Sequence, residues 1–124
     1  LLHTIGVVDK PSPPNKFINK YIFPGGICPS LSQIVKPIEK TGLIVADTET
    51  LIRHYDKTLL SWLNRFMAKK DLVKDMFDEK FVKMWSFYLA SCAAAFRYRD
   101  LVVFQLQIVK NFNAARPTRD YIYS

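Results

Sequence analysis

Three segments of the chain carry the apolar, β-branched pattern that is typical of buried or half-buried strands. They are residues 1–8 (LLHTIGVV), residues 43–50 (LIVADTET) and residues 101–109 (LVVFQLQIV). The third alternates most regularly, which places every second side chain from Val102 to Ile108 on one face. The pattern therefore predicts strands near the start, in the middle and near the end of the sequence.

The residues between the first two strands follow helical patterns instead. Residues 15–22 predict one or two helical turns, and residues 31–40 predict a longer helix with its apolar positions on one face. Ser30 and Gln33 have the spacing of a capping box at the start of this longer helix, and Pro37 should kink it. The first part of the chain is thus predicted to alternate strand, short helices and strand.

The region between the second and third strands is predicted to be almost entirely helical. One helix begins at about Asp56, a shorter one covers residues 71–77, and the longest follows its N-cap Asp78 and ends at about residue 99. Strands separated by long helical stretches predict the α/β fold class. Residues 111–124 show no such pattern and predict a basic, loose tail.

The three predicted strands would make an incomplete sheet. Both edges and both faces of a sheet must be covered, and a sheet of three strands with nothing further leaves edges and faces exposed. The chain also opens on Leu-Leu-His, inside an apolar element and without a Met. We therefore expect the 124 residues to be a piece of a larger fold.

Composition and charge narrow the class of protein. The chain is 49% hydrophobic and 23% charged, as globular domains are, and no apolar run reaches the ~20 residues of a membrane-spanning helix. The formal net charge of +7 suits acidic phospholipid or nucleic acid, and it suits plain solubility equally well. Because no run of basic residues exceeds two, an arm that binds nucleic acid is disfavoured.

Few residues indicate chemistry by themselves. Cys28 and Cys92 lie far apart and outside any Cys/His cluster, which predicts free thiols and no metal site. The chain holds neither the dinucleotide-binding nor the P-loop glycine motif. Cys92, on the apolar face of a helix, has the pattern of a buried, inert thiol. The aromatic residues of the long helix fit either a core or an apolar tunnel for a lipid chain.

Six sequence motifs, in this order along the chain, resemble those of a known family: LLHTIG, NKYIFPGG, PSLSQI, HYDKTLLSW, MWSFYLASCAAAFR and LVVFQ. Together they resemble the C-terminal half of the cyclopropane-fatty-acyl-phospholipid synthases, which include the mycolic acid cyclopropane synthases. The resemblance implies a seven-stranded, Rossmann-like methyltransferase fold that depends on S-adenosylmethionine. Its fifth, sixth and seventh strands would be residues 1–8, 43–50 and 101–109, with the seventh antiparallel between the other two. Residues 56–99 would be a helical insert over the acyl pocket.

The resemblance also implies a reaction, cofactors and a location. The family moves a methyl group from S-adenosylmethionine to a cis double bond of a phospholipid acyl chain, and a bound bicarbonate then takes a proton so that the ring closes. The glycine-rich loop of this family lies in the N-terminal half. Residues 1–110 would be the C-terminal portion of the methyltransferase domain. The 124 residues alone should neither bind S-adenosylmethionine nor turn over. The implied setting is the inner face of a bacterial membrane in the cytoplasm, with no nucleic acid partner and with homo-oligomers or self-association through an open strand edge.

The residues that match the family's site are carried over one by one. His3 and Tyr55 would donate side-chain hydrogen bonds to bicarbonate, and Ile5 would donate its backbone N–H. Residues that would line the acyl pocket are Phe23, Tyr88 and Cys92. Two alternatives stay open: a relative that leaves a methyl, methoxy or hydroxyl branch in place of a ring, and a non-catalytic basic α/β module that binds acidic membranes or nucleic acid.

Overall fold

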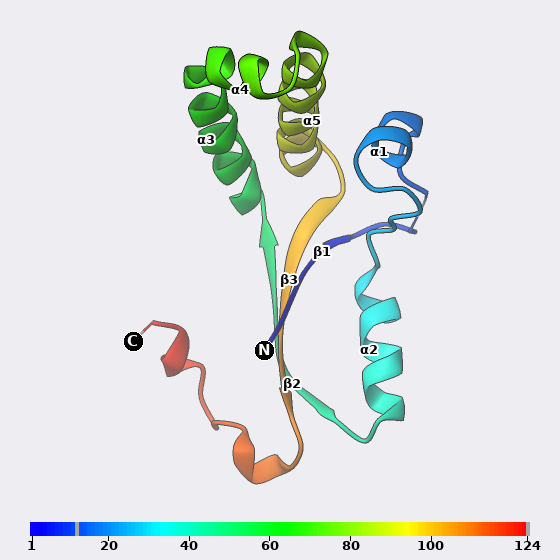
Figure 1. Ribbon diagram of the computed structural model, residues 1–124. Coiled ribbons are helices and arrows are strands. Elements are labelled where there is room, and N and C mark those ends of the chain that lie inside the picture. Colours follow the sequence, from blue (N-terminus) through cyan, green and yellow to red (C-terminus); the bar gives the residue numbers. More distant parts are fainter. Residues whose placement is uncertain (12, 124) are drawn as a thin grey trace.

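The last strand in the sequence lies in the centre of the sheet. The computed structural model describes residues 1–11 and 13–123, and it orders the strands β1 (Leu2–Val7), β3 (Leu101–Val109) and β2 (Ile44–Ile52). The central strand β3 runs antiparallel to both neighbours (Figure 1). The α/β class and the insertion of the third strand between the other two are therefore confirmed. The second strand extends two residues beyond its predicted end.

The described residues form five α-helices, which fall into two groups (Figure 1). Helix α2 (Leu31–Lys40) lies along one face of the sheet, next to the short helix α1 (Lys16–Tyr21) in sequence. Helices α3 (His54–Ala68), α4 (Lys70–Met76) and α5 (Glu79–Tyr98) gather beyond one end of the strands. No helix that the structure describes is long and apolar enough to cross a membrane.

Two apolar clusters hold these groups to the sheet. The α2 cluster has Val102, Phe104 and Leu106 of β3 at its centre, which confirms the face predicted from the alternation. The α3–α5 cluster has Leu59 of α3 and Phe96 of α5 at its centre. Each of these five side chains is at most 2% exposed. Because the strand supplies alternate side chains to the two clusters, β3 links both halves of the core.

The start of α3 differs from the prediction. The helix begins at His54, two residues before the predicted start at about Asp56. The reason is Arg53, whose φ of 62° turns the chain sharply out of β2. An arginine carries no sequence signal for this left-handed conformation, which glycine and asparagine adopt more readily.

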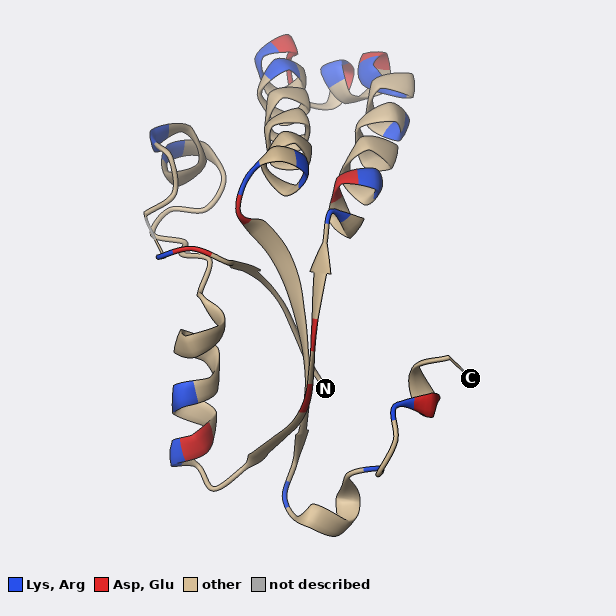
Figure 2. Cartoon of the chain, turned by 180° about the vertical axis from the view of Figure 1, so that it is seen from behind, with Lys and Arg blue, Asp and Glu red and all other residues tan. Residues whose placement is uncertain are grey.

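The chain after β3 is not loose where it meets the sheet. It forms the short turns η1 (Phe112–Ala114) and η2 (Asp120–Ile122), and Arg119 Nε donates to Asp47 Oδ2 at 2.8 Å. The Tyr121 hydroxyl donates to the same Oδ2 at 2.7 Å and lies 2.8 Å from Oε1 of Gln107. The prediction of a loose tail is wrong for these residues, because a carboxylate on β2 binds them. Figure 2 shows acidic positions (red) within the strands and basic positions (blue) along the chain that follows β3. Ser124 lies outside the described residues.

Candidate active site

His3 and Ile5 lie on one face of β1, the face that points towards the α3–α5 cluster. In the register of the sheet, Ile5 pairs with Val103, which belongs to that cluster, and His3 pairs with Gln105 one row further along. The His3 ring is exposed, and its Nδ1 lies 3.1 Å from Nε2 of Gln105. Leu51 of β2 pairs with Val103 from the other side, so Ile5, Val103 and Leu51 lie side by side on the same face of the sheet.

The backbone of Ile5 presents its N–H to the open edge of β1. Val8 N–H donates to Asp100 O at 3.0 Å, so the even-numbered residues of β1 form the hydrogen-bonded pairs with β3. The N–H groups of the odd-numbered residues point the other way, as Val7 does in donating to Pro29 O at 3.0 Å. The Ile5 N–H therefore faces away from β3, where a ligand can reach it.

Tyr55 lies in the first turn of α3, against the α3–α5 cluster. Its ring centroid is 5.2 Å from that of Phe96 and 5.8 Å from that of Trp62, and the side chain is half-buried. Among the residues that the structure describes, none accepts a hydrogen bond from the Tyr55 hydroxyl. The phenol is thus held by its ring contacts and keeps its donor free.

The three predicted pocket residues come together. Tyr88 and Cys92 are one turn apart on α5, and Phe23 stands edge-on to the Tyr88 ring at 6.2 Å. Burial, with the neighbouring Cys92 as a smaller cause, raises the pKa of Tyr88 from 10.0 to about 12. Burial also raises the pKa of the Cys92 thiol. Both groups therefore stay protonated and neutral near pH 7.

The structure adds Cys28 to this group. Cys28 lies close enough to Tyr88 and Cys92 to contribute a little to the raised pKa of each, and burial followed by the charge of Asp100 raises the pKa of Cys28 itself. It comes from the loop between α1 and α2, where no periodic pattern points to a site. Tyr55 packs against the same α3–α5 cluster as Tyr88 and Cys92, so one predicted bicarbonate ligand lies on the same core as two of the pocket residues. The structure does not bring His3 into contact with this group.

An ion pair ties the start of α3 to the end of α5 next to Tyr55. Arg97 Nε donates to Asp56 Oδ2 at 2.7 Å, and Asp56 is 4% exposed. The hydrogen bond from Arg97, against the cost of burial, lowers the pKa of Asp56. The other oxygen, Oδ1, is buried without a partner among the described residues. No sequence pattern predicted this contact, because its residues are 41 positions apart.

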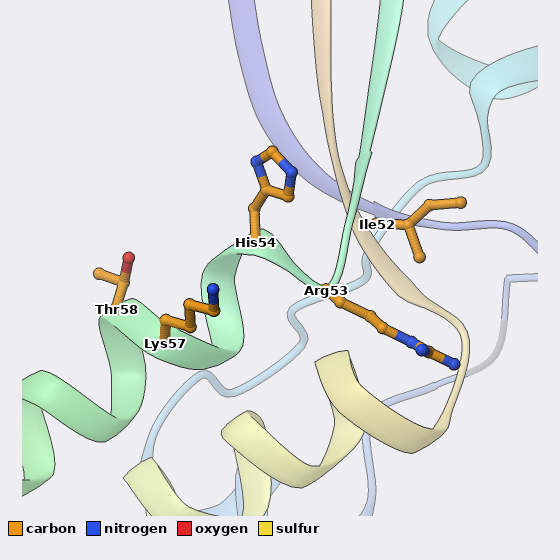
Figure 3. Close-up of a pocket in the computed structure, with 5 residues that line it drawn as sticks. All are labelled: Ile52, Arg53, His54, Lys57 and Thr58. Carbon is orange, nitrogen blue, oxygen red and sulfur yellow. The ribbon is translucent and has the colours of Figure 1, made fainter.

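A separate opening lies at the start of α3. It has a volume of about 490 Å³ and is lined by Ile52, Arg53, His54, Lys57 and Thr58. In Figure 3 the Arg53 side chain extends away from His54, towards the end of α5. None of the six predicted site residues lines this opening.

Comparison with known proteins gives a consistent set of relatives. Residues 1–106 match the family described as mycolic acid cyclopropane synthetase. The chain is 40% identical over 106 residues to cyclopropane-fatty-acyl-phospholipid synthase of Escherichia coli (strain K12), which is 86% of this chain and 28% of that protein. It is 42% identical over 96 residues to tuberculostearic acid methyltransferase UfaA1 of Mycobacterium tuberculosis, which is 76% of this chain and 22% of that protein.

Solved structures give the same result. The cyclopropane synthase MmaA2 from Mycobacterium tuberculosis superposes with a TM-score of 0.77 at 26% identity. The mycolic acid cyclopropane synthase CmaA1, complexed with SAH and CTAB, superposes with a TM-score of 0.76 at 28% identity. Each match covers 86% of this chain and 42% of the other. The chain therefore spans less than half of the length of these relatives.

Proposed function

The chain belongs to the mycolic acid cyclopropane synthetase family, and from this premise we propose that it supplies the acyl pocket and the bicarbonate ligands of a lipid cyclopropane synthase. The substrate would be a phospholipid with a cis-unsaturated acyl chain, and the enzyme would work at the inner face of a bacterial membrane. The observation that carries the proposal is that Tyr55, Tyr88 and Cys92 pack against one apolar cluster, with the Phe23 ring edge-on to Tyr88.

The chemistry of this group suits a lipid chain that becomes transiently cationic. Its lining is aromatic and apolar, so it can accept an acyl chain. Because their raised pKa values keep Tyr88 and Cys92 protonated, neither presents an anionic nucleophile that would capture a carbocation. The electron-rich ring faces of Phe23 and Tyr88 can stabilise positive charge in the pocket.

The residues also fit bicarbonate as a bound anion. Ile5 and Tyr55 offer hydrogen-bond donors that the described part of the chain does not occupy, and His3 can offer a third through its ring. Bicarbonate would supply the base that removes the proton before ring closure. The three donors would hold and orient it, as fixed donors hold an oxyanion in other enzymes.

The residues do not fit S-adenosylmethionine. The sequence holds no glycine-rich loop after a strand, and such a loop at a helix N-terminus is how this class of fold binds its nucleotide-like ligands. We expect calorimetric titration of the 124-residue chain with S-adenosylmethionine to show no saturable heat, whereas the Escherichia coli synthase should bind under the same conditions. Micromolar binding by this chain alone would show that the prediction is wrong.

The open edge of β1 gives a prediction about association. On the outer side of β1, Val7 N–H donates to Pro29 O, whereas Ile5 N–H has no partner within the described residues. Leu1 and Val8, which flank the strand, are 86% and 63% exposed. Such an edge pairs readily with another copy. Sedimentation of the isolated chain should therefore show dimers or larger species that dissociate on dilution. A monomer that excludes a hydrophobic dye at high concentration would count against this.

The proposal is tested by transplanting the segment. In the Escherichia coli synthase, the matched 106 residues are replaced by residues 1–106 of this chain, and the chimera is mixed with S-adenosylmethionine, bicarbonate and unsaturated phospholipid vesicles. We expect acyl chains that gain one methylene, with proton NMR distinguishing a ring from a methyl branch. Saturated vesicles are the control. A folded chimera that binds S-adenosylmethionine but transfers nothing contradicts the proposal.

A further inference from the structure

Gln105 meets the His3 ring from the central strand. The two residues pair directly across β1 and β3, and Gln105 Nε2 lies 3.1 Å from His3 Nδ1. Both side chains lie on the face of the sheet that carries the α3–α5 cluster. The contact joins residues 102 positions apart, so it depends on the register of the folded sheet.

The chemistry of the two side chains fixes where the proton lies. A neutral imidazole has one N–H donor and one bare nitrogen acceptor, whereas an amide nitrogen can only donate. An amide that donates to Nδ1 therefore requires the ring proton on Nε2. We propose that Gln105 is a positioning residue that holds His3 as the Nε2–H tautomer, with this N–H directed to the bound anion. The role in catalysis rests on the proposed function, which makes His3 a donor to bicarbonate.

The surroundings of Gln105 suit a positioning role. Its neighbours in the strand, Phe104 and Leu106, are 2% and 0% exposed, so the backbone that carries the amide is firmly held. Gln107, two residues on and on the same face, has a different partner: its Oε1 contacts the Tyr121 hydroxyl. The two glutamines are chemically identical, and Gln105 contacts His3 only because the register of the sheet pairs these two residues.

The test measures the tautomer directly. Nitrogen-15 NMR of the ring nitrogens is recorded on the 124-residue chain at about pH 8, above the ordinary histidine pKa, and below the concentration at which it self-associates. His54 is the internal reference, since its ring makes no hydrogen bond to the described part of the chain. We expect the Nε2–H form to be enriched in His3 roughly fivefold over His54, the effect of one neutral hydrogen bond.

Three variants sharpen the test. Gln105→Met should return the ratio of the Nε2–H to the Nδ1–H tautomer in His3 to the ratio found in His54, because methionine cannot donate to Nδ1. Gln105→Glu should make the Nδ1–H tautomer of His3 the major form, because a carboxylate accepts a hydrogen bond from Nδ1–H. Gln107→Met is the matched control on the same strand and face and should change nothing at His3.

Two results would overturn the inference: a predominant Nδ1–H form in the unaltered chain, or a ratio that Gln105→Glu leaves unchanged. The NMR sample contains no bicarbonate or lipid, so the tautomer ratio of His3 does not depend on whether the proposed function is correct. In the chimera, Gln105→Glu should lower kcat with little change in KM for phospholipid. If the Gln105→Glu chimera had the same kcat as the unaltered chimera, Gln105 would have no role in the reaction, whatever the tautomer of His3.

Discussion

Tyr55→Phe in the chimeric synthase is expected to lower kcat by roughly 10²–10³-fold while KM for phospholipid stays nearly the same. The hydroxyl is proposed to donate to the anion that takes the proton, and its loss removes one fixed donor from a site of developing charge. Packing should survive, since the ring contacts with Trp62 and Phe96 do not involve the hydroxyl. Steady-state turnover on unsaturated vesicles gives both constants.

Two additions make this experiment specific. Extra bicarbonate should recover part of the lost turnover, because weaker binding of the anion is part of the defect. Tyr98→Phe is the matched control: it removes the same hydroxyl from a side chain that is 78% exposed at the end of α5, and kcat should not change. If Tyr55→Phe kept full kcat, or raised only KM, Tyr55 would be a lipid-facing or structural residue instead.

Arg97→Met is expected to lower the Tm of the 124-residue chain by roughly 10 °C at neutral pH, because it leaves the Asp56 carboxylate buried without its counter-charge. Arg97→Lys should lower Tm less, since a cation is kept but the guanidinium geometry is lost. Lys83→Met is the control. It removes an exposed pair with Glu79, 2.9 Å apart on α5, and should have little effect.

The pH dependence of this effect has a definite sign. Arg97 lowers the pKa of Asp56 in the folded chain, so the pair stabilises the fold above the unfolded pKa of about 3.9. The stabilisation is lost as the pH falls through the lower, folded value. The gap in Tm between the unaltered chain and Arg97→Met should therefore narrow below about pH 4. A gap that stays constant into this range would mean that the charge on Asp56 is not its cause.

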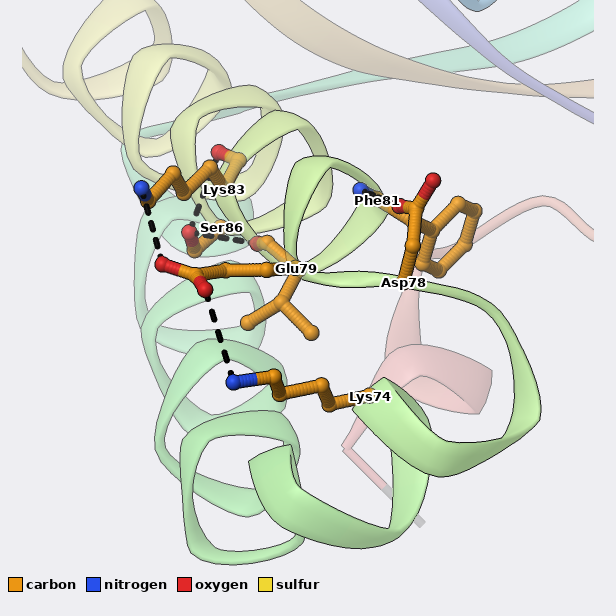
Figure 4. Close-up of polar contacts among 7 residues, drawn as sticks. Lys74, Asp78, Glu79, Phe81, Lys83 and Ser86 are labelled. Carbon is orange, nitrogen blue, oxygen red and sulfur yellow. Dashed lines mark hydrogen bonds and ion pairs between the residues drawn. The ribbon is translucent and has the colours of Figure 1, made fainter.

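Local signals predicted most of the elements correctly. Asp78 is the clearest case: its Oδ1 accepts from Phe81 N–H, and α5 begins at the next residue, as the capping pattern indicates (Figure 4). Ser30 and Gln33 likewise start α2 as predicted. These contacts join residues three positions apart, so the sequence contains all that is needed to find them.

Contacts between distant residues could not be predicted in the same way. The docking of Arg119 on Asp47 spans 72 positions, and no periodicity or capping rule links them. The order of the strands came from the family resemblance, because three apolar segments alone allow several arrangements. The pocket group was predicted by the same route for Phe23, Tyr88 and Cys92, whereas Cys28 lay outside every motif and was found only in the structure.

The central place of β3 has a consequence for how the chain folds. β1 and β2 bond to β3 and not to each other, so within these 124 residues no sheet can form until residues 101–109 are available. Both pairings then close loops of tens of residues, which makes the folding transition slow compared with that of a helical domain. During synthesis, the helices can form early, whereas β1 and β2 have no partner strand within these residues until β3 is made. A chaperone that shields extended apolar segments should therefore bind the nascent chain until β3 has left the ribosome.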